Sequence, residues 1–278
     1  MNKESRTYMS CLCLFTAFAF AGWAKLYGQG AEKPLVIAHL CDPQLGFYED
    51  SFSADSARFE QAIRRVNELS PDVTLIAGDM VNDINDEYAV ATISKLIAKI
   101  RTPVILTPGN HDLPDPVTLD GLKRYRSVFG QDFTVHEYAG RCIISANSQL
   151  WRKAPDEECR QQDQKLRDAL QEARKKGLAV ILLTHIPPFV SSVDEKEAYF
   201  NLPKAVRYEI LRLCEDNGVI IWLAGHIHTT AERYYGSGMA ILNAETTSVN
   251  FDDHPAGFRL LTMYPDHHFS WDFVSLEE

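Results

Sequence analysis

Residues 219–230 read VIIWLAGHIHTT, so an apolar run of strand length ends at a glycine and is followed by His226 and His228. Side chains two positions apart in an extended segment point to the same face, which would set the two imidazoles side by side. Two neighbouring histidines at a strand end can be a structural pair, but their ring nitrogens then need a partner. A bound metal ion supplies that partner, so the segment is a candidate metal site at the end of a buried strand.

Apolar runs of similar length recur upstream of this strand and alternate with longer amphipathic segments. The runs cover residues 35–40, 73–77, 104–107, 142–146 and 178–184. Between them, apolar side chains fall at helical spacing in residues 54–69, 87–100, 157–176 and 203–217. This alternation predicts an α/β domain with a largely buried sheet. Shorter runs at 238–244 and 257–264 predict a meander of antiparallel strands that completes a second sheet.

The size and charge of the chain limit the kinds of protein it can be. It has 278 residues, 45% of them hydrophobic, which suits one domain with a continuous core over residues 31–278. Its 28 lysines and arginines stand against 38 aspartates and glutamates, a formal net charge of −10, and no basic run appears. Such a chain would not neutralise a phosphate backbone, so nucleic acid is not expected as a partner.

Residues 1–30 have the pattern of an export signal. Lys3 and Arg6 precede the apolar run 11–24, and small residues lie near the end of that run. The alternative is a transmembrane anchor, but the run stops at Lys25, short of the roughly 20 apolar residues that span a bilayer. We expect the segment to be cleaved and the domain to be exported to the periplasm or secreted, with no stable membrane anchor.

Strong apolar runs are followed at once by polar residues that a core strand would not carry. The stretches are CDPQLG (41–46), GDMVND (78–83), PGNHDLP (108–114), THIPP (184–188) and GHIHTT (225–230). Taken one at a time, most of them could be ordinary turns or helix caps. In an open α/β sheet, however, ligands bind outside the carboxyl ends of the strands, so the stretches are expected to converge. A single metal cluster then explains all of them.

The residue types in these stretches indicate the kind of metal. Aspartate, asparagine, glutamine and histidine without cysteine form a mixed oxygen and nitrogen set, which suits manganese, iron, magnesium or zinc. The candidate ligands are Asp42, Gln44, Asp79, Asn110, His185, His226 and His228. They are too many for one ion, but they suit two divalent metal ions roughly 3.5–4 Å apart that share a bridging carboxylate. Such a pair activates water and clamps the oxygens of an in-line displacement, which favours phosphoester hydrolysis.

The same stretches, in the same order, resemble the sequence blocks of the calcineurin-like metallophosphoesterase superfamily, D-x-H, G-D, G-N-H-[DE], H and G-H-x-H. The resemblance extends from Asp42 to His228, most of the mature chain. It implies a four-layer α/β/β/α sandwich, which is consistent with the alternation of strands and helices. The D-P-Q form of the first block is similar to the branch of the superfamily that contains a mammalian Ser/Thr phosphatase.

The resemblance also implies a role for each candidate residue. One metal ion would be bound by Asp42, Gln44, Asp79 and His228. The other would be bound by Asp79, as the bridge, together with Asn110, His185 and His226. His111 would lie near the leaving-group oxygen as a general acid or a stabiliser of the transition state, oriented by Asp112. The alternative for His111 is a histidine on an exposed surface loop.

The sequence departs from the superfamily pattern at Gln44, where most members have a histidine. An amide oxygen replaces an imidazole nitrogen and is usually a poorer ligand, so either the first ion is bound loosely or Gln44 contacts only a bound water. A further difference separates the chain from purple acid phosphatases. These have a tyrosine three residues after the G-D aspartate, where this sequence has Asn82. A tyrosinate bond to iron(III) is therefore not expected.

The expected substrate is a phosphomonoester, either a small molecule or a phosphopeptide. The same site could instead cleave a phosphodiester, such as a cyclic nucleotide or a lipid headgroup, and a non-catalytic binding module is a further alternative. Substrate choice would lie in loops 113–121, 151–158 and 189–199. Aromatic residues of the last two loops could line the pocket or merely pack beneath it, and they are Trp151, Phe189 and Tyr199.

Overall fold

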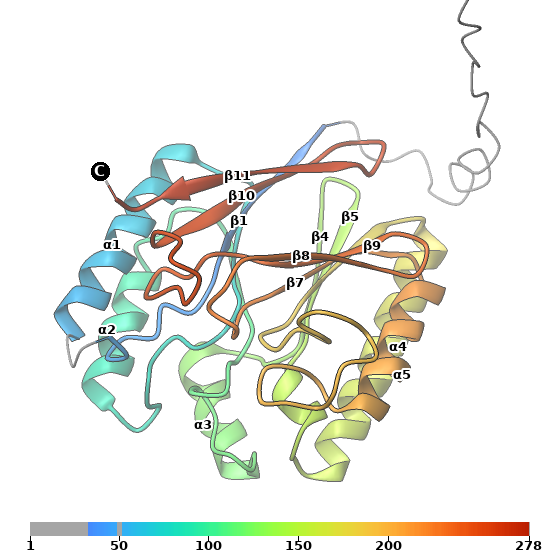
Figure 1. Ribbon diagram of the computed structural model, residues 1–278, viewed down its shortest axis with the longest axis horizontal. Coiled ribbons are helices and arrows are strands. Elements are labelled where there is room, and N and C mark those ends of the chain that lie inside the picture. The colour runs from blue at the N-terminus through green and yellow to red at the C-terminus, as the bar shows by residue number, and fades with distance from the viewer. Residues whose placement is uncertain (1–32, 49–51, 278) are drawn as a thin grey trace, which may run out of the picture.

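Two β-sheets pack face to face in the centre of the structure, and helices cover the outer face of each sheet (Figure 1). The computed structural model describes residues 33–48 and 52–277. The segment expected to direct export, residues 1–30, lies outside this part of the chain. The order of layers is helix, sheet, sheet, helix, which confirms the α/β class and the four-layer sandwich.

The parallel strands of each sheet end along a common edge. The first sheet has the order β11 (Phe269–Ser275), β10 (Gly257–Met263), β1 (Leu35–Leu40), β2 (Val73–Ile76) and β3 (Val104–Leu106). The second has the order β4 (Thr134–Tyr138), β5 (Arg141–Ser145), β6 (Ala179–Leu183), β7 (Val219–Ala224), β9 (Met239–Asn243) and β8 (Ala231–Tyr235). β1, β2 and β3 are parallel, and so are β5, β6, β7 and β9. The turns that follow these parallel strands therefore meet.

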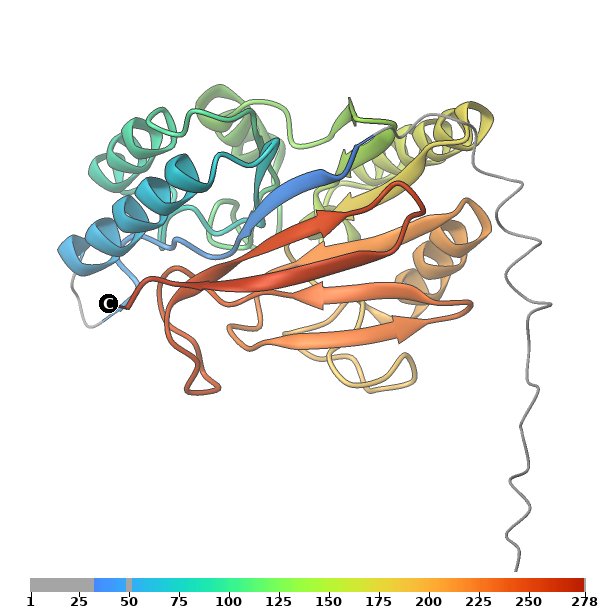
Figure 2. The same ribbon diagram turned by 90° about the horizontal axis from the view of Figure 1, so that it is seen from above.

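The helices form two groups. The first sheet is covered by α1 (Phe52–Leu69), α2 (Glu87–Ile97) and α3 (Leu119–Phe129), and the second by α4 (Asp156–Lys176) and α5 (Lys204–Asp216), with the short 3₁₀ helix η1 (Ser148–Trp151) before α4. Figure 2 shows α1 and α2 at one end of the molecule and α4 and α5 at the other. Within the described residues, none of the helices combines the length and the apolarity needed to cross a membrane.

The two sheets share an apolar core between their inner faces. β1 and β2 contribute Ile37 and Leu75, and the facing strands contribute Ile181, Ile221 and Leu242, all fully or almost fully buried. Strands that bury both faces need near-continuous apolar runs, and this explains the sequence pattern of β1, β6 and β7. Burying one such side chain stabilises the fold by about 1.5–3 kcal/mol. The result is a rigid platform beneath the polar turns.

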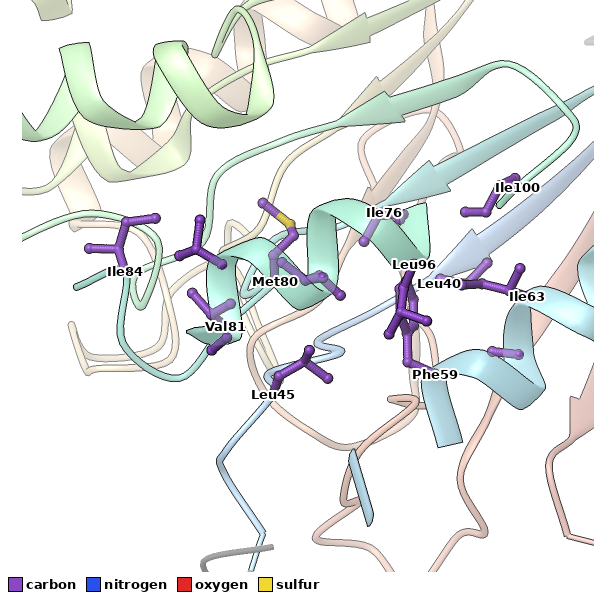
Figure 3. Packing of buried hydrophobic residues seen from close by; sticks show 14 of the residues in the cluster. Leu40, Leu45, Phe59, Ile63, Ile76, Met80, Val81, Ile84, Leu96 and Ile100 are labelled. Carbon is purple, nitrogen blue, oxygen red and sulfur yellow. The ribbon is translucent and has the colours of Figure 1, made fainter. Parts of the chain in front are cut away.

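The turns after β1 and β2 are anchored in the apolar cluster under α1 and α2. Figure 3 shows Leu45, Met80 and Val81 close to the side chains that join the helices to the sheet, including Phe59 and Leu96. All five are buried, and Leu45 and Val81 also form a short parallel bridge. Because apolar residues directly follow the polar ones, the backbone of each turn is fixed on the core.

The sequence interpretation of the C-terminal part is wrong in one respect. The hairpin β8–β9 extends the second sheet, with β9 parallel to β7, but the hairpin β10–β11 pairs with β1 in the first sheet. The two hairpins therefore do not form one meander that completes a second sheet. Short amphipathic strands carry a pattern for one buried face, but nothing in that pattern selects the sheet edge with which they pair. The sequence also missed α3, because only Leu122 and Tyr125 of that helix are buried.

Candidate metal centre

The seven predicted ligands gather at the carboxyl ends of five strands. Asp42 and Gln44 follow β1, Asp79 follows β2, Asn110 follows β3, His185 follows β6, and His226 and His228 follow β7. All are buried except Asn110, which is partly exposed. One ligand atom each from Asp79, His185 and His226 lie within 4.8 Å of one another. The expected convergence therefore exists in the structure.

The backbone beneath most of these side chains is left-handed. The φ angles are 46° at Asp42, 39° at Gln44, 50° at Asp79, 72° at His226 and 51° at His228. Residues other than glycine disfavour the left-handed conformation, which costs about 1–3 kcal/mol per residue unless the surroundings compensate. The sharp left-handed turn directs each side chain off the end of its strand and into the common space. Strain concentrated in this way is typical of a functional site.

Glycines allow two of the turns to approach the ligands. A Cβ atom on Gly109 would overlap the carboxylate of Asp79, and a Cβ on Gly225 would lie 2.6 Å from Oδ2 of Asp42. Either contact would push a carboxylate out of place. This explains the glycine before Asn110 and the glycine before His226 in the sequence stretches that predicted the site.

Asp79 lies between the other groups. Its Oδ1 accepts a hydrogen bond of 2.8 Å from the backbone N–H of His111, and its Oδ2 lies 3.2 Å from Nε2 of His185. Asn110 Oδ1 is 3.0 Å from the same Nε2 atom. Oxygen and nitrogen donors from three separate turns thus face one point.

Asp42 occupies the opposite side of the centre. The backbone N–H of His226 donates to its carboxylate over 3.1 Å, and Nε2 of His228 lies 3.6 Å from its Oδ1. His185 also approaches it, with Nδ1 at 3.9 Å from Oδ1. Two buried aspartates beside several imidazoles form a set that needs compensating positive charge, because unpaired buried carboxylates are costly.

Each histidine is held by a backbone carbonyl through one ring nitrogen. Nδ1 of His185 bonds to the carbonyl of Ala77 at 2.6 Å, and Nδ1 of His228 bonds to that of Val249 at 2.6 Å. Nε2 of His226 bonds to the carbonyl of Tyr199 at 3.0 Å. A carbonyl only accepts, so the bonded nitrogen carries a proton, and the other nitrogen faces the centre, where it can ligate a metal ion once it is deprotonated. This arrangement suits metal ligation.

Gln44 gives a direct test of whether the residues fit a metal ion. Its amide nitrogen donates to Oδ1 of Asn82 over 3.3 Å, while Oε1 is buried and has no hydrogen-bond partner among the described residues. A buried carbonyl oxygen without a partner is costly. A cation bound beside Gln44, or a water bound to that cation, would satisfy the atom. The donor set therefore fits the divalent metals expected from the sequence.

The pKa values of Asp42 and Asp79 are shifted in opposite directions. Burial raises the pKa of Asp42. Burial alone would also raise the pKa of Asp79, but the adjacent His185 and His111 outweigh it and hold that pKa well below its usual range. Burial lowers the pKa of His226 to about 3. For His185, burial is outweighed by Asp79 and Asp42, which raise the pKa to about 9. Asp79 is thus the group that most firmly carries a negative charge.

His111 and Asp112 both lie at the centre, and among the described residues the His111 ring bonds to Asn82 and the Asp112 carboxylate bonds to backbone N–H groups. Nδ1 of His111 bonds to the carbonyl of Asn82 at 2.8 Å, so Asn82 orients the ring. Asp112 is fully buried and accepts backbone N–H groups of Met80 and Gly109, at 2.9 and 2.8 Å. Burial, reinforced by the charge of Asp79, raises its pKa to about 7. Asp112 therefore joins the two turns that carry Asp79 and Asn110.

A cleft of about 440 Å³ opens beside His111. Its lining includes Asn82, Ile84, Asn110, His111, Leu113 and Arg124. The lining mixes amide, apolar and charged side chains, and Arg124 is itself bonded to the carbonyl of Ile84 and to Glu87. The cleft thus offers space for an organic group next to the imidazole of His111.

The aromatic residues of the expected specificity loops behave differently from one another. Trp151 and Phe189 are buried and pack in the cluster between the second sheet and its helices, so they lie beneath the surface. Tyr199 is 51% exposed and its ring lies 4.8 Å from that of His226. Phe251, which the sequence interpretation missed, stacks on His228 with ring centroids 4.7 Å apart. The loop that carries Phe251 has no signal in the sequence that would connect it to the centre.

The fold and the site together define a class of enzyme. An α/β/β/α sandwich that collects carboxylates, amides and imidazoles at one rim is the framework of a metallophosphoesterase. Residues 35–230 match the family model of the calcineurin-like phosphoesterases, and the chain belongs to this family. It is a metal-dependent phosphoester hydrolase, with divalent metal ions as cofactors.

Known proteins similar to the chain include phosphatases. The Bos taurus serine/threonine-protein phosphatase CPPED1 is 26% identical over 258 residues, 84% of this chain and 81% of that protein. Purple acid phosphatase PPD1 from yellow lupin matches 91% of this chain and 53% of its own, with a TM-score of 0.66 at 18% identity. A dimetal phosphatase from Danio rerio matches 89% and 100%, with a TM-score of 0.61 at 13% identity. The two solved structures support the fold assignment.

Proposed function

We propose that the protein hydrolyses phosphomonoesters at a centre of two divalent metal ions, and that phosphorylated serine or threonine side chains are among its substrates. The observation that carries this proposal is the gathering of Asp79, His185 and His226 within 4.8 Å, with Asp42 and Gln44 beside them. The similarity to serine/threonine-protein phosphatases favours a monoester over a diester.

The ligands divide into two overlapping sets. Asp42, Gln44, Asp79 and His228 would hold one ion, and Asp79, Asn110, His185 and His226 the other. Asp79 would belong to both sets, because its carboxylate lies beside His185 and carries the most stable negative charge. Manganese, iron, magnesium and zinc all suit these donors. When bound, such a pair supplies a hydroxide nucleophile and neutralises the charge of the phosphoryl group.

His111 would supply the proton for the leaving group. Its Nδ1 is occupied by the carbonyl of Asn82, so Nε2 is the nitrogen that can meet the substrate. A protonated imidazole can donate from Nε2 to the departing alcohol oxygen, which typically accelerates such a step by about 10²–10⁴-fold. The adjacent cleft would hold the alcohol itself, and Asn82 fixes the ring toward it.

Asp112 would hold together the two turns that carry Asp79 and Asn110. Its carboxylate accepts N–H groups from both the Asp79 turn and the Asn110 turn. Loss of these bonds would let the two turns move apart, and the distance between Asp79 and Asn110 would then increase. We therefore assign Asp112 a positioning role in place of the contact with His111.

The decisive experiment compares phosphoester classes with the full domain, residues 31–278, loaded with manganese. We expect turnover of p-nitrophenyl phosphate and of a phosphoserine peptide, and far less turnover of bis-p-nitrophenyl phosphate. Activity confined to the diester would replace the proposal with a phosphodiesterase acting on cyclic nucleotides or lipid headgroups. Two bound ions without hydrolysis of any ester would point to a non-catalytic binding module.

We also propose that residues 1–30 direct export to the periplasm or secretion and are then removed. The support is the charged start and the apolar run of this segment. Cell fractionation and N-terminal sequencing of the mature protein test the proposal together. Full-length protein in the cytoplasmic fraction would contradict it, and full-length protein in the membrane fraction would favour the anchor.

A further inference from the structure

Tyr199 contacts two of the proposed ligands of the second ion from a single loop. The amide nitrogen of Asn110 donates to its hydroxyl oxygen over 2.9 Å. Nε2 of His226 donates to its backbone carbonyl over 3.0 Å. The tyrosine is 51% exposed, so core packing does not explain why its side chain lies there. The hydrogen bonds with Asn110 and His226 explain its position instead.

The first contact holds the nitrogen end of the Asn110 amide, on the side away from His185. An asparagine amide can turn over, exchanging its oxygen and nitrogen, but only the oxygen can bind a metal. With the nitrogen held by the hydroxyl of Tyr199, Oδ1 lies toward His185, 3.0 Å from Nε2. In this orientation Asn110 can act as a ligand, and the hydroxyl holds the amide nitrogen while Oδ1 faces His185.

The second contact fixes the proton on His226. Because the Tyr199 carbonyl accepts from Nε2, the lone pair of the ring lies on Nδ1. The tyrosine ring also covers the imidazole, with centroids 4.8 Å apart. The imidazole thus keeps one orientation and one tautomer while it faces Asp79 and His185.

The loop that carries Tyr199 is held firmly enough for this task. Arg152 donates to the Tyr199 carbonyl over 3.1 Å, and its guanidinium lies 5.4 Å above the ring. Within the loop, the buried Asn201 bonds to the carboxylate of Glu195 at 2.6 Å. Arg207 of α5 bonds from beneath to the Glu195 carbonyl at 2.9 Å. These contacts place Tyr199 before any ligand arrives.

We propose that Tyr199 is a positioning residue that prepares Asn110 and His226 together for the second metal ion. The inference rests on the proposed function, because it requires that these two residues bind the ion. Hydrogen bonds to metal ligands typically change metal affinity by about 10–100-fold. The side-chain contact can be removed alone, since Tyr199→Phe deletes the hydroxyl and keeps the ring and the carbonyl.

Manganese titration of the metal-free domain tests the proposal without relying on activity. In the wild type we expect two ions to bind, and in Tyr199→Phe the binding step of the ion held by Asn110 and His226, identified as the step that Asn110→Ala weakens, should lose about 10–100-fold in affinity. The other step should change little. Electron paramagnetic resonance should show fewer spin-coupled manganese pairs in the variant at limiting metal. Tyr234→Phe is the matched control, because this tyrosine is also exposed and hydrogen-bonded, to Glu232, but lies on β8.

A double-mutant cycle shows whether Tyr199 acts through Asn110. Asn110→Ala removes the ligand, so adding Tyr199→Phe should then cause little further loss of affinity. Additive losses, or an equal weakening of both binding steps, would mean that the hydroxyl serves only the general stability of the loop and would overturn the inference.

The titration distinguishes a wrong role for Tyr199 from the absence of a dinuclear centre. A wild-type domain that binds two ions, with Tyr199→Phe binding them equally well, would reject the role of Tyr199 alone. A wild-type domain that binds fewer than two ions would reject the dinuclear centre, and the inference with it.

Discussion

The backbone N–H of His111 donates to Oδ1 of Asp79 over 2.8 Å, so the proposed proton donor and the proposed bridging ligand are held by one hydrogen bond. The bond links the turn after β3 to the turn after β2. Asp112, the next residue, adds a second link between the same turns. The position of His111 relative to Asp79 is thus set by a backbone N–H group and does not depend on the orientation of the imidazole.

Asp79→Asn is expected to lower turnover by on the order of 100-fold or more while the domain stays folded, because it removes the bridging charge. Metal content should fall as well. Phosphatase assays and metal analysis measure the two effects, and circular dichroism with thermal unfolding checks the fold. A variant with near-normal turnover and two bound ions would refute the bridging role.

His111→Ala is expected to lower kcat by about 10²–10⁴-fold and to leave the metal content unchanged. The imidazole contacts the carbonyl of Asn82 and has no place in the ligand sets. The loss should be smallest for esters with acidic alcohols, which leave without protonation, so p-nitrophenyl phosphate and an alkyl phosphate should be compared. Loss of metal in this variant would instead make His111 a ligand.

Gln44→His is expected to tighten metal binding at the first site, since an imidazole nitrogen replaces an amide oxygen. The buried Oε1 atom of Gln44 lacks a hydrogen-bond partner in the described part of the chain, so the position is open to a stronger donor. The measurement is the concentration of manganese that gives half-maximal activity, which should fall. An unchanged concentration would show that residue 44 does not face the ion.

His39→Gln is expected to make the metal-free domain less sensitive to acid. Burial, with a smaller contribution from Arg259, lowers the pKa of His39 from 6.5 to about 3. Between these values the unfolded chain binds a proton that the folded chain does not, so stability falls as the pH falls. The share of His39 is about 2 kcal/mol between pH ~7 and pH ~5. Urea unfolding with a chelator at both pH values should show a smaller loss in the variant, and an equal loss would exclude His39 as the cause.

The strands and the ligand turns were predictable because their chemistry is local. Buried strands need apolar runs, as in β6 and β7, and residues such as Asp79 or His226 are out of place at the end of such a run unless they serve a site. The contacts that orient the ligands were not predictable. Backbone carbonyls hold the three histidines, and they belong to Ala77, Tyr199 and Val249. The side-chain types of these residues do not indicate a metal site.

The placement of the C-terminal hairpins illustrates the same limit. The strands β9 and β10 were visible as short runs, but pairing β10 with β1 depends on the crossing of the chain between the sheets. That crossing brings Val249 and Phe251 to His228. Their role follows from topology, and the residue types alone did not reveal it.

The backbone is left-handed at five candidate ligands, Asp42, Gln44, Asp79, His226 and His228. These side chains therefore lower the stability of the fold while they supply donor atoms for catalysis. Glycine at any one of these positions would relieve about 1–2 kcal/mol of conformational cost and delete a donor atom. In a mutational screen that scores cellular abundance separately from hydrolysis, these positions should keep or gain abundance with glycine while losing all hydrolysis. Core positions would lose both scores together. The centre could therefore be mapped genetically, with no knowledge of the natural substrate.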